Sequence, residues 1–225
     1  MASAAMLCSL GCAVLVVLSC TATMRFGARY ELALVRVESE RPDGSTVNTP
    51  SNDGMTVGID NLLVRTMADD RGFHLGITNR GGGGAVVYWD DAYVIPPSGG
   101  EARLLVGTTA REEYRQLPRE AGSDLGESRT YVLSDRVRRQ EVPAGTGAWV
   151  IAVPQRMSGL GIVRMFDFSR PCEDLLAQRI TLVVPVELAG NRSVSRLVFA
   201  LSRVVYAPED PTASVSARVC SAGGG

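Results

Sequence analysis

Five apolar residues alternate with other residues in the C-terminal half of the chain: Ile180, Leu182, Val184, Val186 and Leu188. Successive side chains of a strand point to opposite sides, so a period of two places all five on one face of a strand. Turn-forming residues follow at 189–192, and a second alternating row returns at Leu197, Phe199 and Leu201. The segment 180–201 therefore predicts a long antiparallel hairpin. Pro185 lacks an amide hydrogen, which predicts an edge position or a bulge.

Shorter alternating segments recur along the chain between turn-forming residues. The clearest is Phe73, Leu75 and Ile77, followed by a glycine-rich turn. Further strands are expected at residues 30–37, 55–59, 62–66, 85–89, 93–95, 103–106, 130–133, 149–153 and 162–168. Residues 38–54 are expected to form a loop, and residues 110–117 and 171–178 two short helices, the first after a capping box at Thr109. Turn signals every ~8 to 12 residues predict an all-β, antiparallel β-sandwich with one or two short helices.

Composition argues for a packed domain and against nucleic-acid binding. Hydrophobic residues make up 45% of the 225 residues, which suffices for a core. The 23 basic side chains are balanced by 24 carboxylates, for a net charge of -1. The densest basic patch, Arg136, Arg138 and Arg139, is interpreted as a solvated turn or strand face.

The N-terminal segment is apolar from Ala5 to Cys20 and ends in Val17-Leu18-Ser19-Cys20. About 15 apolar residues are too few for the ~20 that a membrane-spanning helix needs, but they suit the core of a signal peptide. An aliphatic residue, an apolar residue, a small residue and a cysteine resemble the lipobox of bacterial lipoprotein precursors. The alternatives are an uncleaved helical anchor and a buried core helix. Cys12 is a poorer lipobox cysteine because Ser9, three residues before it, is not aliphatic.

The lipoprotein resemblance implies a domain organisation. Residues 1–19 would be the signal peptide, 20–28 the lipidated Cys20 with its tether, 29–206 a β-sandwich domain and 207–225 a flexible C-terminal tail. The segment from Phe73 to Ile95, with Ile77-Thr78-Asn79 and Tyr88-Trp89-Asp90, also resembles the immunoglobulin-like domains of uncharacterised bacterial lipoproteins. That second resemblance implies an immunoglobulin-like sandwich and brings no known activity.

After removal of the signal peptide, Cys172 and Cys220 would be the only cysteines besides Cys20. An oxidising envelope permits them to form a disulfide, which would tie the C-terminal tail to the domain. Two unpaired thiols are the alternative.

Residues that could carry catalysis are few. His74 is the only histidine and lies on the strand face opposite Phe73, and no G-x-S-x-G motif is present. One histidine and two distant cysteines give no recognisable zinc spacing. We therefore expect no metal, no cofactor and no enzymatic activity. The alternative is a secreted hydrolase whose acidic loop residues converge, drawn from Asp69, Asp70, Asp90 and Asp91.

Trp89 ends a strand next to polar residues. Its ring is interpreted as packed in the core, and a half-exposed ring that contacts a partner is the alternative. The function expected from the sequence is non-catalytic binding or scaffolding by a lipid-anchored protein of the bacterial cell envelope. Its partners would be the membrane, through the lipid, and an envelope protein. Thr21 follows Cys20 where an inner-membrane retention signal often has Asp, so the lipoprotein resemblance favours the outer membrane.

Overall fold

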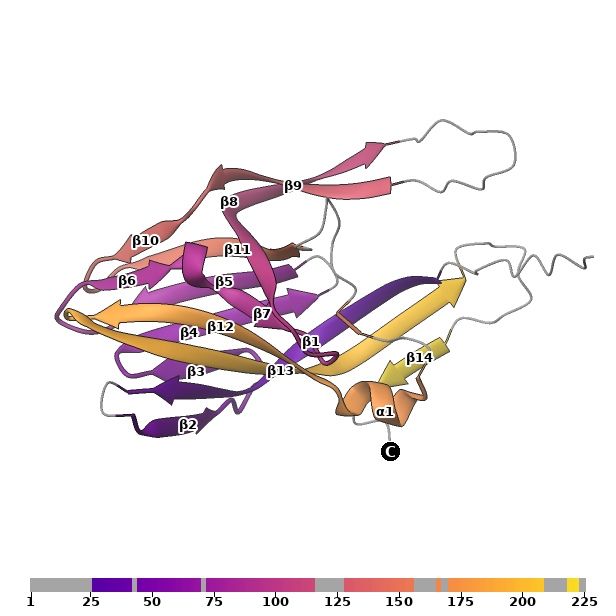
Figure 1. Ribbon diagram of the computed structural model, residues 1–225, viewed down its shortest axis with the longest axis horizontal. Helices are drawn as coiled ribbons and strands as arrows, with labels where there is room; N and C mark the ends of the chain where they lie inside the picture. The colour runs from indigo at the N-terminus through magenta and orange to yellow at the C-terminus, as the bar shows by residue number, and fades with distance from the viewer. Residues whose placement is uncertain are drawn as a thin grey trace, which may run out of the picture.

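The computed structural model describes residues 26–41, 44–69, 72–115, 128–155, 165–166, 170–208 and 218–222, and strands dominate them (Figure 1). The first strands are β1 (Phe26–Glu40), β2 (Thr46–Pro50), β3 (Thr56–Ile59), β4 (Leu62–Asp69), β5 (Gly72–Asn79), β6 (Ala85–Tyr88) and β7 (Tyr93–Ile95). The later strands are β8 (Ala102–Arg115), β9 (Ser128–Arg136), β10 (Arg139–Val142), β11 (Gly147–Gln155), β12 (Arg179–Leu188), β13 (Asn191–Pro208) and β14 (Arg218–Ser221). A 3-10 helix, η1 (Trp89–Asp91), and an α-helix, α1 (Cys172–Ala177), complete the described elements.

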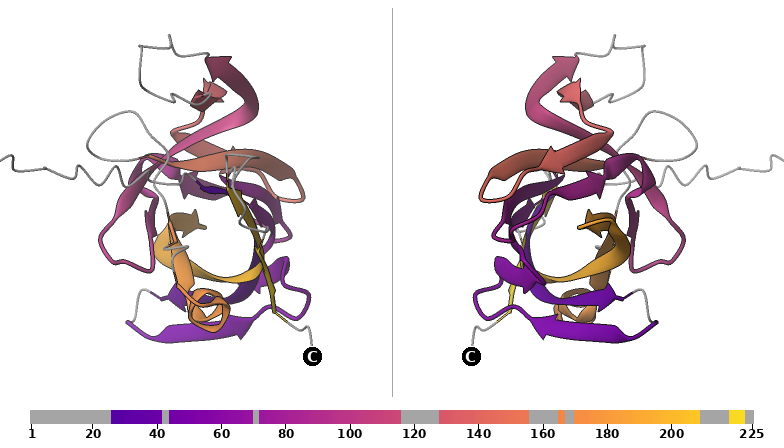
Figure 2. Two further views of the ribbon diagram at one scale, coloured as in Figure 1. Left: turned by 90° about the vertical axis from the view of Figure 1, so that its right-hand side faces the viewer. Right: turned by 90° about the vertical axis from the view of Figure 1, so that its left-hand side faces the viewer.

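Eight strands pair in a closed antiparallel ring. The order around the ring is β12, β7, β8, β11, β5, β4, β1 and β13, and β13 pairs with β12 again. An end-on view shows the strands arranged around a central axis (Figure 2). The predicted antiparallel, all-β fold is confirmed. The immunoglobulin-like detail needs correction, because the strands close into a barrel and the pairing does not divide them into two separate sheets.

The long strand β13 makes the closure possible. It pairs with β1 over almost its whole length, with β12 through ten residue pairs and with β14 through four. The register between β1 and β13 shifts between Glu31 and Leu32, and again between Leu34 and Arg36. Such irregularities increase local twist and bend a strand, which helps a sheet to curl on itself.

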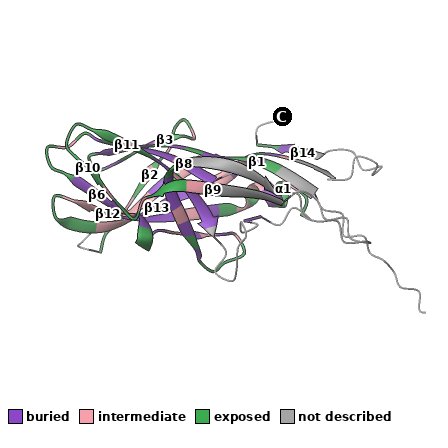
Figure 3. Ribbon diagram, turned by 90° about the horizontal axis from the view of Figure 1, so that it is seen from above, coloured by how far each residue is buried: buried purple, intermediate pink, exposed green. Residues whose placement is uncertain are grey.

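Inward-facing apolar side chains fill the barrel. Phe73, Leu75 and Ile77 are all buried, as the sequence predicts, and the ring of Phe73 lies 5.2 Å from that of Phe199. The predicted hairpin also forms, with β12 and β13 joined by a tight turn in which Ala189 has a φ of 50°. Colouring by burial shows exposed residues at many of the turns that join the strands (Figure 3).

Two local predictions are wrong. The expected helix at 110–117 is strand as far as the structure describes it, because 110–115 continue β8 and pair with β9. The expected loop at 38–54 contains the end of β1 and all of β2. Here the carboxylate of Asp53 accepts hydrogen bonds from the amides of Met55 and Thr56, which lower its pKa to about 2. Most of the strand expected at 162–168 lies outside the described residues.

Pro185 lies neither on an edge strand nor at a bulge. The register between β12 and β13 runs without interruption through the pair Pro185 and Val194. On its other side, β12 pairs with β7 at residues 181–183 and with β6 at residues 186–188. Pro185 therefore falls in the gap between these two partners, where its missing amide hydrogen removes no ladder hydrogen bond.

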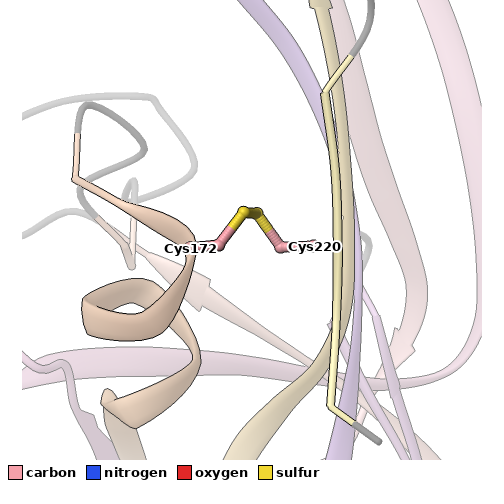
Figure 4. The surroundings of a disulfide bond; sticks show 2 residues. All are labelled: Cys172 and Cys220. Atoms are coloured by element: carbon pink, nitrogen blue, oxygen red, sulfur yellow. A yellow bond between two sulfur atoms is a disulfide. The ribbon is translucent and has the colours of Figure 1, made fainter. Parts of the chain in front are cut away.

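The C-terminal end of the chain is tied to the barrel. The helix predicted at 171–178 is present as α1, and its Cys172 forms a disulfide with Cys220 of β14 (Figure 4). The predicted flexible tail therefore needs correction at residues 218–221, which pair with β13. Cys220 is buried, and its bridge holds both α1 and β14 at one end of the barrel.

Asn79, at the end of β5, organises the glycine-rich turn that follows it. Its side-chain amide donates to the carbonyl oxygens of Gly83 (2.7 Å) and Val142 (2.9 Å), and its Oδ1 accepts from the amide of Gly81 (2.9 Å). Asn79 is almost fully buried, so these bonds satisfy a side-chain amide that solvent hardly reaches, and the bond to the carbonyl of Val142 is itself buried.

We expect Asn79→Ala to lower the free energy of unfolding by about 2–4 kcal/mol, because it leaves the buried carbonyl of Val142 without this partner and removes two further hydrogen bonds to the backbone of the turn. Chemical denaturation measures the change. Thr78→Ala, an exposed neighbour on the same strand, is the matched control and should change stability by less than about 0.5 kcal/mol. Equal stabilities of the two variants would contradict this role of Asn79.

Replacing both bridged cysteines, in Cys172→Ser/Cys220→Ser, should lower the free energy of unfolding by about 2–4 kcal/mol. The bridge closes a long loop, with a sequence separation of 48, and so restricts the unfolded chain. Denaturation with and without dithiothreitol is the measurement. The reductant should destabilise the wild type and leave the double variant unchanged; a wild type that is insensitive to reductant speaks against the bridge.

Candidate functional site

The outer surface of β4, β5 and β11 presents three rows of paired residues. The rows are Leu63, Thr78 and Gly147; Arg65, Gly76 and Trp149; and Met67, His74 and Ile151. We call these nine residues the Trp149 face. Their neighbours along each strand point inward and fill the core, so the nine side-chain positions face outward.

Trp149 lies flat on this surface. A Cβ added to Gly76 would lie 2.7 Å from Cζ2, 2.8 Å from Cε2 and 3.0 Å from Cη2 of Trp149. Three nearly equal distances place the six-membered ring of the indole face-on over Gly76. One face of the ring therefore rests on the backbone of β5, and the side chain is still 57% exposed. Only glycine leaves room for the ring in this position.

The polar side chains beside the indole are available for binding. Within the described part of the chain, the guanidinium of Arg65 and the imidazole of His74 have no hydrogen bond or ion pair to another residue. Arg65 is exposed and His74 partly exposed. None of the nine residues carries a carboxylate. The Trp149 face thus combines an aromatic plane, apolar neighbours such as Met67 (53% exposed) and one unpaired cation.

Trp89 does not lie on the surface. Its side chain is 1% exposed, and its indole Nε1 donates to Oε1 of Gln140 at 3.1 Å. The backbone amide of Trp89 also donates to the carbonyl of Arg138, so the start of η1 is held against the strand β10. The candidate partner contact at Trp89 is therefore wrong, and the ring belongs to the core, as the sequence was interpreted.

Two of the acidic residues considered for a hydrolase, Asp90 and Asp91, lie near arginines. Asp91 pairs with Arg192 at 2.6 Å, and Asp90 lies 3.7 Å from Arg136 and 3.9 Å from Arg138. These ion pairs are exposed, which agrees with the interpretation of the basic patch as a solvated surface. Asp69 ends β4 opposite Gly72, and Asp70 lies outside the described residues.

Tyr88 lies beside this charged group. Its hydroxyl donates to Oε2 of Glu187 at 2.5 Å, and this hydrogen bond raises the pKa of Tyr88 above its usual value. The guanidinium of Arg192 lies 4.6 Å from the centre of the Tyr88 ring, within range of a cation–π interaction. These contacts link Tyr88 of β6 to Glu187 of β12 and to Arg192 of β13.

A small cavity of about 20 Å³ lies among inward-facing side chains of β3, β4, β5, β12, β13 and Trp89. Its lining is apolar except for Ser195, whose buried hydroxyl has no hydrogen-bond partner. This volume is about that of one water molecule, and a buried water needs two to four polar partners. Organic ligands need several hundred Å³, so this cavity does not hold one.

The remaining predicted positions concern metals and the membrane. Within the described residues, no cluster of three or more His, Cys, Asp or Glu side chains could bind a metal ion. The proposed lipidation site, Cys20, lies outside the described residues. Among the helices that the structure describes, none has the length and apolar character needed to cross a membrane.

Sequence reasoning named Trp89 as the candidate surface contact, beside core packing, and did not single out Trp149. The signal for Trp149 was present in two alternations: Phe73, Leu75 and Ile77 point inward, which turns Gly76 outward, and Val150 similarly turns Trp149 outward. What the sequence did not reveal is the pairing of Trp149 with Gly76, which joins strands about 70 residues apart. No protein-family model, curated protein or solved structure matches the chain.

The two tryptophans should differ sharply in solvent access. We expect acrylamide to quench the fluorescence of Trp149 strongly and that of Trp89 weakly, because their side chains are 57% and 1% exposed. Trp149→Phe should therefore remove the quenchable component and shift the remaining emission to shorter wavelength. Stern–Volmer plots of the wild type and the variant measure this. Unchanged quenching in Trp149→Phe would contradict the assignment of the exposed ring.

Proposed function

We propose that this chain is a lipid-anchored protein of the bacterial cell envelope that acts by binding, without catalysis. The disulfide between Cys172 and Cys220 is the observation that carries the proposal. Disulfides persist in oxidising compartments such as the periplasm and the cell surface, and are rare in the reducing cytosol. The bridge therefore supports export of the chain.

The positions of the other cysteines also support export and lipidation. The chain has five cysteines, and the three outside the bridge, Cys8, Cys12 and Cys20, all lie in the N-terminal apolar segment. Cleavage before Cys20 would remove Cys8 and Cys12, and lipidation would modify the thiol of Cys20. The mature protein would then carry no free thiol, which suits an oxidising environment.

In this proposal the lipid on Cys20 attaches the protein to the membrane, and the Trp149 face binds another component of the envelope. Two or three acyl chains on one residue attach a protein to a membrane stably, whereas a single chain binds only marginally. The anchored barrel would present the exposed indole of Trp149 to another component of the envelope. Thr21, in place of an aspartate after the cysteine, favours the outer membrane as the location.

Expression in a bacterium that processes lipoproteins tests the proposal, using the wild type, Cys20→Ala and the matched control Cys12→Ala. We expect the wild type and Cys12→Ala to lose residues 1–19, gain the mass of acyl chains and fractionate with membranes. Cys20→Ala should carry no acyl mass. Intact-mass spectrometry and membrane fractionation measure these results. An unmodified wild type, or acylation that persists in Cys20→Ala, would refute the anchor.

A further inference from the structure

We propose that the Trp149 face binds an acidic sugar of an envelope polysaccharide, with the sugar ring stacked on Trp149 and its carboxylate paired with Arg65. This inference rests on the proposed function, because export gives the chain access to such polysaccharides. It also assigns a ligand class and contact residues that the proposed function leaves open.

The first argument is the orientation of the indole. The face of an aromatic ring carries partial negative charge, and the C–H groups of a sugar ring carry partial positive charge, so the two surfaces pack face to face. Trp149 offers one whole face, because its other face lies on Gly76. A side chain that inserts into lipid must project from the surface. The flat indole of Trp149 therefore fits a flat ring better than a lipid surface.

The second argument is rigidity. Trp149 and Gly76 lie on neighbouring strands of the closed ring, and β5 pairs with β4 on one side and β11 on the other. Because the indole of Trp149 already rests on the backbone of β5, binding would order few additional side-chain torsions. A preformed site avoids about 0.5–1.5 kcal/mol of ordering cost for each side chain that is already fixed.

The third argument is charge. The indole extends from β11 over Gly76, and the next residue in that row is Arg65 on β4. Neighbouring strands lie about 4.8 Å apart, so the backbone positions of Arg65 and Trp149 are separated by roughly 10 Å, with the indole between them. Arg65 has no ion-pair partner among the described residues, and a guanidinium binds a carboxylate through two parallel hydrogen bonds. The site thus matches a ring that bears a carboxylate.

The rows on either side supply hydrogen-bonding groups for sugar hydroxyls. Thr78 and His74 flank Gly76 on β5, and both side chains point to the outer face. The hydroxyl of Thr78 can donate and accept, as can the two nitrogens of a neutral imidazole. Apolar Met67 and Ile151 lie in the row of His74 and extend the surface along the strands.

The test is binding by the purified full-length chain in a polyoxyethylene detergent, which contains no sugar that could compete. The probes are tetragalacturonate, a hyaluronan tetrasaccharide and N-acetylmuramic acid, with the uncharged methyl ester of tetragalacturonate as a control ligand. Phosphatidylglycerol vesicles test for a lipid surface instead. Titration calorimetry and tryptophan fluorescence are the readouts.

Four variants separate the contributions. Trp149→Ala should weaken binding of the acidic sugar at least tenfold. Arg65→Gln should lower the affinity for tetragalacturonate to the affinity that its methyl ester shows. Gly76→Ala removes no binding group but displaces the indole, so it should weaken binding several-fold. Its control is Gly58→Ala, because a Cβ at Gly58 meets no atom within 4 Å, and this variant should bind normally. Circular dichroism and thermal unfolding establish that each variant is folded.

Millimolar or tighter binding of at least one acidic sugar, lost in Trp149→Ala, supports the proposal. It is overturned if none of the three sugars binds in a Trp149-dependent way, or if only the vesicles do. Equal affinity for the acid and its methyl ester overturns the role of Arg65. Cys20→Ala should bind the sugar as the wild type does, so failure of the anchor and failure of sugar binding are separate results.

Discussion

The pairing of β13 on both of its sides is the constraint on which the rest of the structure depends. This strand joins β1 to β12 and so closes the ring, and near its end it also accepts β14. Closure gives each of the eight ring strands a partner on both sides, which limits their pairing with other chains. It also fixes the end of the barrel where the disulfide links α1 to β14.

Closure also separates an inner surface that packs from an outer surface that is available for binding. The inward residues of β4, β5 and β11 form the core, and their outward neighbours form the Trp149 face. On β5, the middle strand of the three, Gly76 has no side chain, so the indole of Trp149 lies directly on the backbone. The acidic residues near η1 instead lie beside arginines, in exposed ion pairs. The face with an unpaired cation is therefore the better candidate for a ligand.

Local patterns predicted elements well where burial and periodicity agreed. The hairpin of β12 and β13 and the inward row of Phe73 follow from alternation alone. The helix predicted from the capping box at Thr109 is absent because residues 110–115 pair with β9, which outweighs the local helix signal. The position of Pro185 could not be predicted because β12 changes its partner from β7 to β6 around this residue. The closure of the barrel and the contact of Trp149 with Gly76 join distant segments, and a single sequence does not encode such pairings in any local pattern.

The most direct test of the account is the chemical shift of the two Hα protons of Gly76, measured by NMR. An indole lying flat on Gly76 places the Hα that points outward, in the direction a Cβ would take, in the shielding region of its ring current, and the second Hα serves as an internal reference. The account predicts a clear upfield shift, which disappears in Trp149→Leu, and nuclear Overhauser contacts from the Trp149 ring protons to Gly76. Ordinary glycine shifts without such contacts would contradict a preformed aromatic plane, and with it the proposed binding site.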